Sequence, residues 1–227
     1  MKYLILLFFQ LFCYAQSIQA ANDDVLVRLR EEIKNSQKYD AQKIEKIKKL
    51  HQKASLAKTA DNKYQSYIQL FKAYQSYKYD SASVYADKAL MVAHSLRNKN
   101  YLVEATCAKV FCLLSAGLYK EAFDEINKVD MSEVTTPYYI YKYYSVKSRL
   151  YSDMADYCRT APYDAYYVKQ SRIFTDTLKR YTGVNTTWYY YVEGMQLMKE
   201  RKCDKSEKAF LKVLSDKTID THVRAIC

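Results

Sequence analysis

A short pattern recurs in this chain at an interval of forty residues. Tyr79-Asp80-Ser81-Ala82 and Tyr119-Lys120-Glu121-Ala122 each present an aromatic residue, two polar residues and a small residue, with helical periodicity on both sides. Self-similarity at such an interval is typical of arrays of paired helices. Because these arrays carry extended binding surfaces more often than catalytic pockets, the pattern also bears on function.

The composition favours helices throughout. Only 3 Gly and 2 Pro occur in 227 residues, so few positions can adopt a positive φ or interrupt a helix. With 49% hydrophobic and 27% charged residues, the chain is predicted to be globular rather than disordered. We therefore expect an all-α fold.

Small residues mark the repeats. Ala82, Ala122, Ala165 and Ala209 are separated by 40, 43 and 44 residues, and each is assigned to the second helix of a hairpin, where it lets two backbones approach closely. The separation exceeds the roughly 34 residues of a standard tetratricopeptide unit. The sequence thus predicts a helical-hairpin repeat array, a tetratricopeptide-like solenoid, over residues 61–217.

Several helix boundaries can be predicted from capping residues. Asp80 and Asp204 are suited to be the N-caps of second helices. Thr136-Pro137 is suited to begin a first helix, and Gly117 is suited to end one. Thr160-Ala161-Pro162 is expected to open the partner helix of the third hairpin.

A leading helix pair is expected before the repeats, over residues 22–60. Its first helix would turn Leu26, Leu29 and Ile33 inward. Its second would start at Asp40, with an inner face formed by Ile44, Ile47, Leu50 and Ala54. The lysines of this second helix alternate with apolar residues, which favours a solvated helix face over a nucleic-acid site despite the formal charge of +11. These lysines are Lys43, Lys46, Lys48, Lys49 and Lys53.

The chain begins with an export signal. Lys2 precedes an apolar run from Tyr3 to Phe12, and small residues then allow cleavage after Ala15, with a second possible site after Ala20. We expect residues 1–15 to be a signal peptide and the remainder to be exported to the periplasm. Residues 218–227 resemble the start of a further first helix, from which we expect the chain to be a fragment of a longer protein.

The cysteines match no metal spacing. Small, buried apolar roles are predicted for them, while a disulfide between Cys158 and Cys203 stays open. The five beyond the leader are Cys107, Cys112, Cys158, Cys203 and Cys227.

The stretch from Asp23 to about Ala93 resembles a known family. The motifs are Tyr64-Gln65-Ser66-Tyr67, Leu70-Phe71 and Tyr77 to Ala86, preceded by the leading helices with Tyr39-Asp40 and Lys43-Ile44. This arrangement is similar to the amino-terminal part of the tetratricopeptide-bearing transcriptional regulators of Bacteroidetes, the group related to the starch-utilisation regulator. The resemblance implies an exported repeat region followed by a transmembrane helix, a cytoplasmic coiled coil and a helix-turn-helix. Neither a transmembrane nor a DNA-reading segment is recognisable here, so no DNA-contacting residue is carried over.

No catalytic constellation can be assembled from the sequence. The three histidines, His51, His94 and His222, are scattered, and no phosphate loop, nucleophile elbow or zinc helix motif occurs. We therefore predict a non-catalytic chain without a cofactor or a metal site.

Two tyrosine-rich clusters are the best candidates for binding. One spans residues 138–144 and the other residues 188–191, and because consecutive helical residues point around the axis, each cluster places some rings outside its packing face. We take Tyr139, Tyr143, Trp188 and Tyr190 as candidate ligand-binding residues. The alternative is that these rings fill seams between helices.

Three functions follow as hypotheses. The first is a periplasmic sensing and protein-interaction module of a membrane-spanning transcriptional regulator, which reaches the membrane only through a C-terminal part outside this sequence and binds no nucleic acid through this segment. The second is a free-standing secreted scaffold that binds a protein or peptide. The third is a protein that binds an oligosaccharide through the tyrosine rows.

Overall fold

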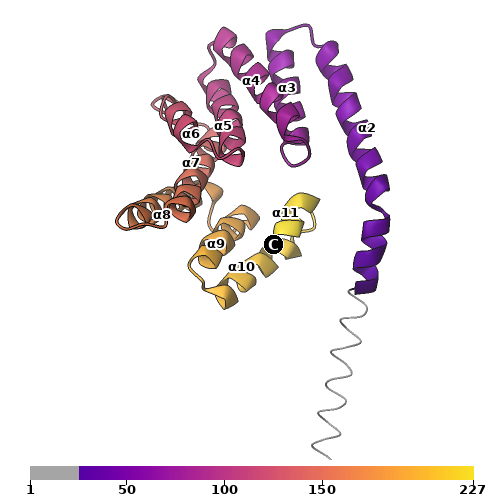
Figure 1. Cartoon of the computed structure of the whole chain (residues 1–227). Coiled ribbons are helices and arrows are strands. Elements are labelled where there is room, and N and C mark those ends of the chain that lie inside the picture. Colours follow the sequence, from indigo (N-terminus) through magenta and orange to yellow (C-terminus); the bar gives the residue numbers. More distant parts are fainter. Residues whose placement is uncertain (1–25) are drawn as a thin grey trace, which may run out of the picture. The chain divides into compact units, whose positions relative to one another are not determined.

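The computed structural model describes residues 26–227, and the predicted signal peptide therefore lies outside the described residues. The chain divides into two units, one ending at Gln52 and the other running from Lys53 to Cys227. The residues that the structure describes contain helices and connecting segments but no strand, which confirms the all-α prediction (Figure 1). None of the helices within residues 26–227 combines the length and the apolar character that a membrane crossing requires.

The leading segment differs from its prediction. Residues 26–34 are helical, and α2 (Ser36–Ser55) follows directly, with the backbone bonds Asn35 N→Glu31 O and Tyr39 N→Asn35 O carrying the helical pattern across the junction. No reversing turn separates two helices here, because the segment contains neither Gly nor Pro. Asp40 consequently lies inside α2 instead of starting a helix.

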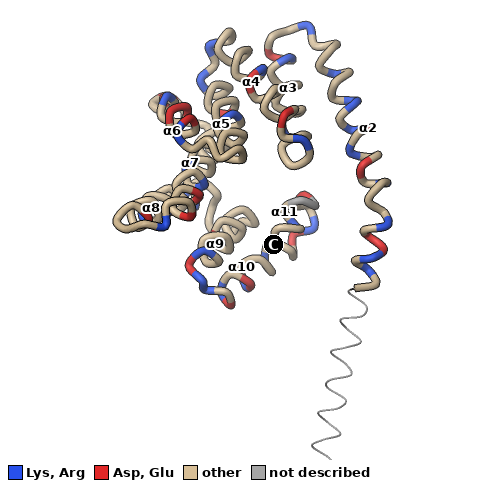
Figure 2. The backbone as a smooth tube through the Cα atoms, in the orientation of Figure 1, with Lys and Arg blue, Asp and Glu red and all other residues tan. Residues whose placement is uncertain are grey.

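Four of the seven apolar residues expected to face inward in this segment are exposed, whereas Ile47 is buried and Leu50 and Ala54 are half-buried. Leu26 is 48%, Leu29 53%, Ile33 62% and Ile44 55% exposed. The lysines behave as predicted for a solvated face: four are exposed and Lys43 is half-buried. Figure 2 shows blue lysine and arginine segments spread along α2 and recurring on the later helices, interspersed with acidic residues.

Four consecutive helical hairpins occupy residues 60–215. They are α3 (Ala60–Tyr74) with α4 (Tyr79–Leu96), α5 (Lys99–Ser115) with α6 (Tyr119–Ile126), α7 (Pro137–Cys158) with α8 (Tyr163–Thr182), and α9 (Thr187–Lys199) with α10 (Cys203–Ser215). Each hairpin also packs against the next, through α4 on α5, α5 and α6 on α7, and α8 on α9. A short helix, α11 (Thr221–Ile226), follows where the start of a further first helix was predicted.

The predicted helix boundaries are largely confirmed. Thr136 is the N-cap of α7, with Pro137 in its first turn, and Gly117 has a φ of 75° just beyond α5. Asp80 and Asp204 are not N-caps, however: Lys78 and Lys202 occupy those positions. Both aspartates lie two residues further on, in the first turn, where a negative charge still interacts favourably with the helix dipole.

Small residues seal the first two hairpins as predicted. Ala82 is 1% exposed and packs with Phe71, Ala108 and Cys112, while Ala122 is fully buried. Tyr79 and Tyr119 lie beside these seams, the first exposed and the second half-buried. The central helix α5 is surrounded by neighbours, and residues 103–108 are all buried.

The third hairpin departs from the predicted repeat. Ala165 is exposed, whereas Ala209 in the fourth hairpin is buried. The close contact between α7 and α8 is made instead by hydroxyl side chains: Ser148 Oγ lies 2.6 Å from Thr175 Oγ1, and Ser171 Oγ donates to the Ser148 carbonyl at 3.0 Å. Short hydroxyl side chains thus take the role that alanine has in the other hairpins.

The cysteines in the described part of the chain are all free, including Cys158 and Cys203. Cys107 and Cys112 are buried, as predicted. Cys203 is exposed, because it is the first residue of α10 and lies outside the seam between α9 and α10.

Candidate functional site

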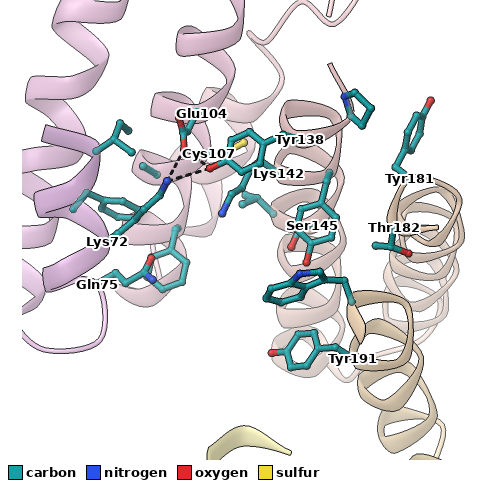
Figure 3. A pocket seen from close by; sticks show the side chains of 18 residues that line it. Lys72, Gln75, Glu104, Cys107, Tyr138, Lys142, Ser145, Tyr181, Thr182 and Tyr191 are labelled. Atoms are coloured by element: carbon teal, nitrogen blue, oxygen red, sulfur yellow. Dashed lines mark hydrogen bonds and ion pairs between the residues drawn. The ribbon is translucent and has the colours of Figure 1, made fainter. Parts of the chain in front are cut away.

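A groove of about 560 Å³ is lined by the first helices of all four hairpins. Residues of α3, α5, α7 and α9 contribute to its walls, with two residues from the end of α8 (Figure 3). Its lining includes Lys72 of α3, Glu104 of α5, Tyr138, Tyr141 and Lys142 of α7, and Trp188 and Tyr191 of α9. A surface assembled from successive repeats in this way suits an extended ligand.

The spacing of residues along α7 explains why its polar and aromatic side chains reach the groove. Tyr138, Tyr141, Lys142 and Ser145 occur at the i, i+3, i+4, i+7 positions of one helix face, and all four line the groove. Tyr143 lies on a different face of α7 and enters the core, with 7% exposure. The helix α7 therefore has two aromatic faces, one turned toward the core and the other toward the groove.

The charged centre of the groove is Glu104, a carboxylate that is 7% exposed. It accepts hydrogen bonds from the Tyr138 hydroxyl at 2.6 Å, from Lys72 Nζ at 2.9 Å and from the Tyr64 hydroxyl at 3.2 Å. Burial by itself would raise the pKa of Glu104, but the bonds from Tyr138 and Lys72 outweigh it and hold the pKa below its usual range. Glu104 is thus an ionised, fully partnered carboxylate that joins α3, α5 and α7 (Figure 3).

Lys142 is in a different electrostatic position. Burial lowers the pKa of its ammonium, and the neighbouring positive charge of Lys72 lowers it further. The Nζ atom lies 5.5 Å from the centre of the Tyr138 ring, within the range of a cation–π interaction. In Figure 3 the Lys142 side chain extends into the space between α3 and α7.

Three aromatic rings continue the groove beyond Lys142. The ring centre of Trp188 lies 6.3 Å from that of Tyr141 and 5.9 Å from that of Tyr191, both in edge-to-face geometry. Burial raises the pKa of Tyr141 to about 12, whereas Trp188 is 46% exposed. This aromatic trio offers an apolar surface for a large side chain.

A second cavity, of about 390 Å³, lies between α7, α8 and α9 and shares Tyr141, Ser145 and Tyr191 with the groove. Its walls carry the hydroxyls of Ser148 and Thr175. The lining residue Lys199 donates from Nζ to the Ser152 hydroxyl. Because the Ser148 and Thr175 hydroxyls already bond to one another, the other polar groups of the lining are the ones open to a small polar molecule.

The structure separates the four predicted binding residues. Trp188 lines the groove. Tyr190 lies in a separate cleft, where its hydroxyl donates to Asn185 at 2.8 Å and Lys212 Nζ is 4.2 Å from its ring centre. Tyr143 is buried in the core, which corrects its place in an exposed ring row, whereas Tyr139 is half-buried and its binding role stays a prediction.

Sequence reasoning missed most of the residues that line the groove. The cluster at residues 138–144 was recognised, but Tyr138 and Tyr141 were not chosen from it, and Lys72, Glu104 and Lys142 were not singled out. Dividing α7 into its two aromatic faces would have placed Tyr138, Tyr141 and Lys142 together. The link to Glu104 spans 34 residues and has no local sequence signal.

Comparison with known proteins supports the assignment of the chain as an array of helical hairpins. Searches of curated proteins and of solved structures return no significant match. The family model described as the SusR N-terminal TPR domain, where TPR denotes the tetratricopeptide repeat, matches residues 33–227. Domains of this type are generally non-catalytic scaffolds, and within residues 26–227 no three His, Cys, Asp or Glu side chains gather in a way that could hold a metal ion. With most of its length matched by this model and its helices paired in hairpins, the chain belongs to the family of SusR N-terminal TPR domains.

Proposed function

We propose that this domain binds a segment of a partner protein in the groove formed by α3, α5, α7 and α9. The observation that carries the proposal is the groove itself, in which four successive hairpins contribute to one surface with exposed aromatic rings. Tetratricopeptide domains generally mediate protein interactions, and a partly exposed Trp188 beside Tyr191 is the kind of anchor that dominates protein interfaces.

We further propose that the domain acts in the periplasm as the sensing arm of a membrane-spanning transcriptional regulator. The export signal predicted at residues 1–15 and the family relationship support this assignment. In this arrangement, occupancy of the groove is the input, and the segment that crosses the membrane transmits it.

Site-specific photocrosslinking in living cells tests the binding role. A photoreactive phenylalanine analogue at Trp188 or Tyr138, both in the groove, should give protein adducts, whereas the same analogue at the exposed Leu211 of α10, outside the groove, should give none. Equal adducts at all three positions, or none at any, would remove the groove as the binding surface.

The location requires a separate measurement. A tag placed after Cys227, in the full gene product or in this chain alone, allows cleavage to be followed. Protease should cleave residues 26–227 in spheroplasts but not in intact cells. Protection in spheroplasts would place the domain in the cytoplasm and end the sensing proposal, while the binding role of the groove would still stand on the crosslinking result.

A second candidate function is binding of an oligosaccharide in the cavity between α7, α8 and α9. The specific observation is the combination of polar side chains with the rings of Tyr141 and Tyr191 in one cavity, since sugars use both hydrogen bonds and stacking. Calorimetry with a panel of oligosaccharides should detect heats that are lost in Tyr191→Ala and kept in Tyr163→Ala, an exposed tyrosine of α8 outside the cavity. The absence of binding heats throughout the panel would dismiss this candidate.

A further inference from the structure

Three charged side chains line the groove: Lys72, Glu104 and Lys142. Lys72 and Glu104 neutralise one another across 2.9 Å. No carboxylate in residues 26–227 lies within ion-pair distance of the Lys142 ammonium. The groove therefore holds one positive charge without a counterion of its own.

The positive charge of Lys142 is destabilised by its position in the groove. Lys142 is half-buried, and both the loss of solvent and the positive charge of Lys72 oppose its protonation. The negative charge of Glu104 and the ring of Tyr138 favour the protonated form but offset only part of this cost. A negative group entering the groove would interact with Lys142 in a partly desolvated setting, where an ion pair is stronger than on an open surface.

The surroundings of Lys142 define what else the ligand must carry. Tyr141, the residue before Lys142 in α7, belongs to the aromatic trio with Trp188 and Tyr191. An anion bound at Lys142 is thus adjacent to a surface suited to a large apolar side chain. This pairing fits an amino-acid sequence better than a free inorganic anion.

We propose that the partner segment bound by the groove places an aspartate or glutamate side chain against Lys142 and a large apolar side chain against Tyr141, Trp188 and Tyr191. This inference rests on the proposed function, because it specifies the chemistry of the segment that the groove binds.

The position of Lys142 favours an internal acidic side chain over a chain terminus. Residues of α3 and α5 line the groove on one side of α7, and Tyr191 of α9 lines it on the other. A segment that contacts both sides passes Lys142 with residues before and after it. A terminal carboxylate would leave one side of the groove empty.

Selection from a phage library of random dodecapeptides tests the inference. The peptides are fused to the coat protein through their carboxyl ends, so that only side chains can supply a carboxylate, and the purified full chain is the target. Selected peptides should be enriched in Asp or Glu together with an aromatic or large aliphatic residue. Selection on the Lys142→Met variant should lose the acidic enrichment.

Affinities of a selected peptide and its Glu→Gln (or Asp→Asn) counterpart, measured by fluorescence polarisation, then isolate the charge pair. The wild-type chain should bind the acidic peptide at least about tenfold more tightly than the neutral one. Lys142→Met should bind both equally, Lys142→Arg should retain the preference, and Lys169→Met, on the exposed face of α8, should behave as wild type. Lys142→Met is expected to fold, because it replaces a half-buried charge by an apolar side chain of similar length.

Four results would overturn the inference. If the selected peptides are not enriched in acidic residues, or if Lys142→Met still prefers the acidic peptide, the groove binds protein segments by other means and the proposed function survives. If a synthetic peptide with a free carboxyl terminus binds better than the same peptide with an internal acid, the terminus is the ligand. If no peptide is selected at all, the proposed function fails together with the inference.

Discussion

The hydroxyl of Tyr138 donates a 2.6 Å hydrogen bond to the carboxylate of Glu104. These residues belong to consecutive first helices, α7 and α5, and Lys72 of α3 contacts both of them, bonding Glu104 at 2.9 Å and Tyr138 at 3.1 Å. One buried carboxylate therefore fixes three repeats relative to one another at the floor of the groove. The same carboxylate neutralises Lys72 and so leaves Lys142 as the charge available to a ligand.

The variant Tyr138→Phe should destabilise the domain by about 1.5 kcal/mol, because it removes a hydrogen bond to a charged and buried acceptor. The lower end of the usual range applies, since Tyr138 is 43% exposed and water can replace part of the lost bond. Urea unfolding followed by circular dichroism measures the change. Tyr163→Phe, at an exposed position of α8, should stay within about 0.5 kcal/mol of wild type; equal losses in both variants would contradict the role of the Glu104 network.

Acid should weaken the domain through Glu104. Its pKa in the folded chain lies below that of a free glutamate, so the stabilisation is complete above the unfolded pKa of about 4.3 and is lost as the pH falls through the folded value. Asp130 and Asp216, each with a pKa lowered to about 2 by hydrogen bonds, act in the same direction. Glu104→Gln should therefore show a shallower loss of stability between neutral and acid pH than wild type. If Glu104→Gln and wild type showed the same pH dependence, Glu104 would have the same pKa in the folded and the unfolded chain, which contradicts the prediction.

The seams between paired helices can be tested with two alanines. Ala82→Leu should cost about 1–3 kcal/mol, because Ala82 is 1% exposed between Phe71 and α5 and the added atoms have no space. Ala165→Leu, at an exposed position of α8 in the same pattern of repeats, should change the free energy of unfolding by less than about 0.5 kcal/mol. A large loss at Ala165 would restore it as a seam residue and contradict the observed packing.

The paired helices could be predicted because local rules decide them. A near absence of Gly and Pro, a small residue early in the second helices, and the Thr136-Pro137 start each act within a few residues. The leading segment shows the limit of the same rules. Apolar periodicity in residues 26–33 and 44–50 suggested two facing helices, but without a breaking residue between them the helix continues past Asn35.

The groove was harder to predict, because its residues share no local pattern. Both faces of α7 carry tyrosines, so composition alone cannot tell which face meets the core and which meets the groove. The seam of the third hairpin was missed for a related reason: Ser148, Ser171 and Thr175 pack by exchanging hydrogen bonds with one another, and hydrophobic periodicity does not identify such contacts.

Gln196 in α9 carries a buried side-chain oxygen, Oε1, without a hydrogen-bond partner in the described part of the chain. Its amide nitrogen makes only a long bond of 3.4 Å to Glu200. Replacing the amide by an apolar group of similar shape removes the unpaired acceptor, so Gln196→Met should be neutral or stabilise the domain by up to about 1 kcal/mol. Thermal unfolding measures the effect. A loss of more than about 1 kcal/mol would show that Oε1 has a partner, such as an ordered water molecule.

The contact between Gly194 and Phe210 joins α9 to α10. A Cβ atom at Gly194 would lie 2.6 Å from a ring carbon of Phe210, and the nearby Ser206 hydroxyl donates to the Gly194 carbonyl at 2.8 Å, so the two backbones are held close. Gly194→Ala should therefore destabilise the domain by about 1–3 kcal/mol, despite the better helix propensity of alanine. The double variant Gly194→Ala/Phe210→Leu should be more stable than the sum of the two single changes predicts, because the smaller side chain removes the clash. Urea unfolding of the four proteins measures this coupling. Strict additivity would show that the ring of Phe210 moves aside without cost and that the glycine is not required for the approach of α10.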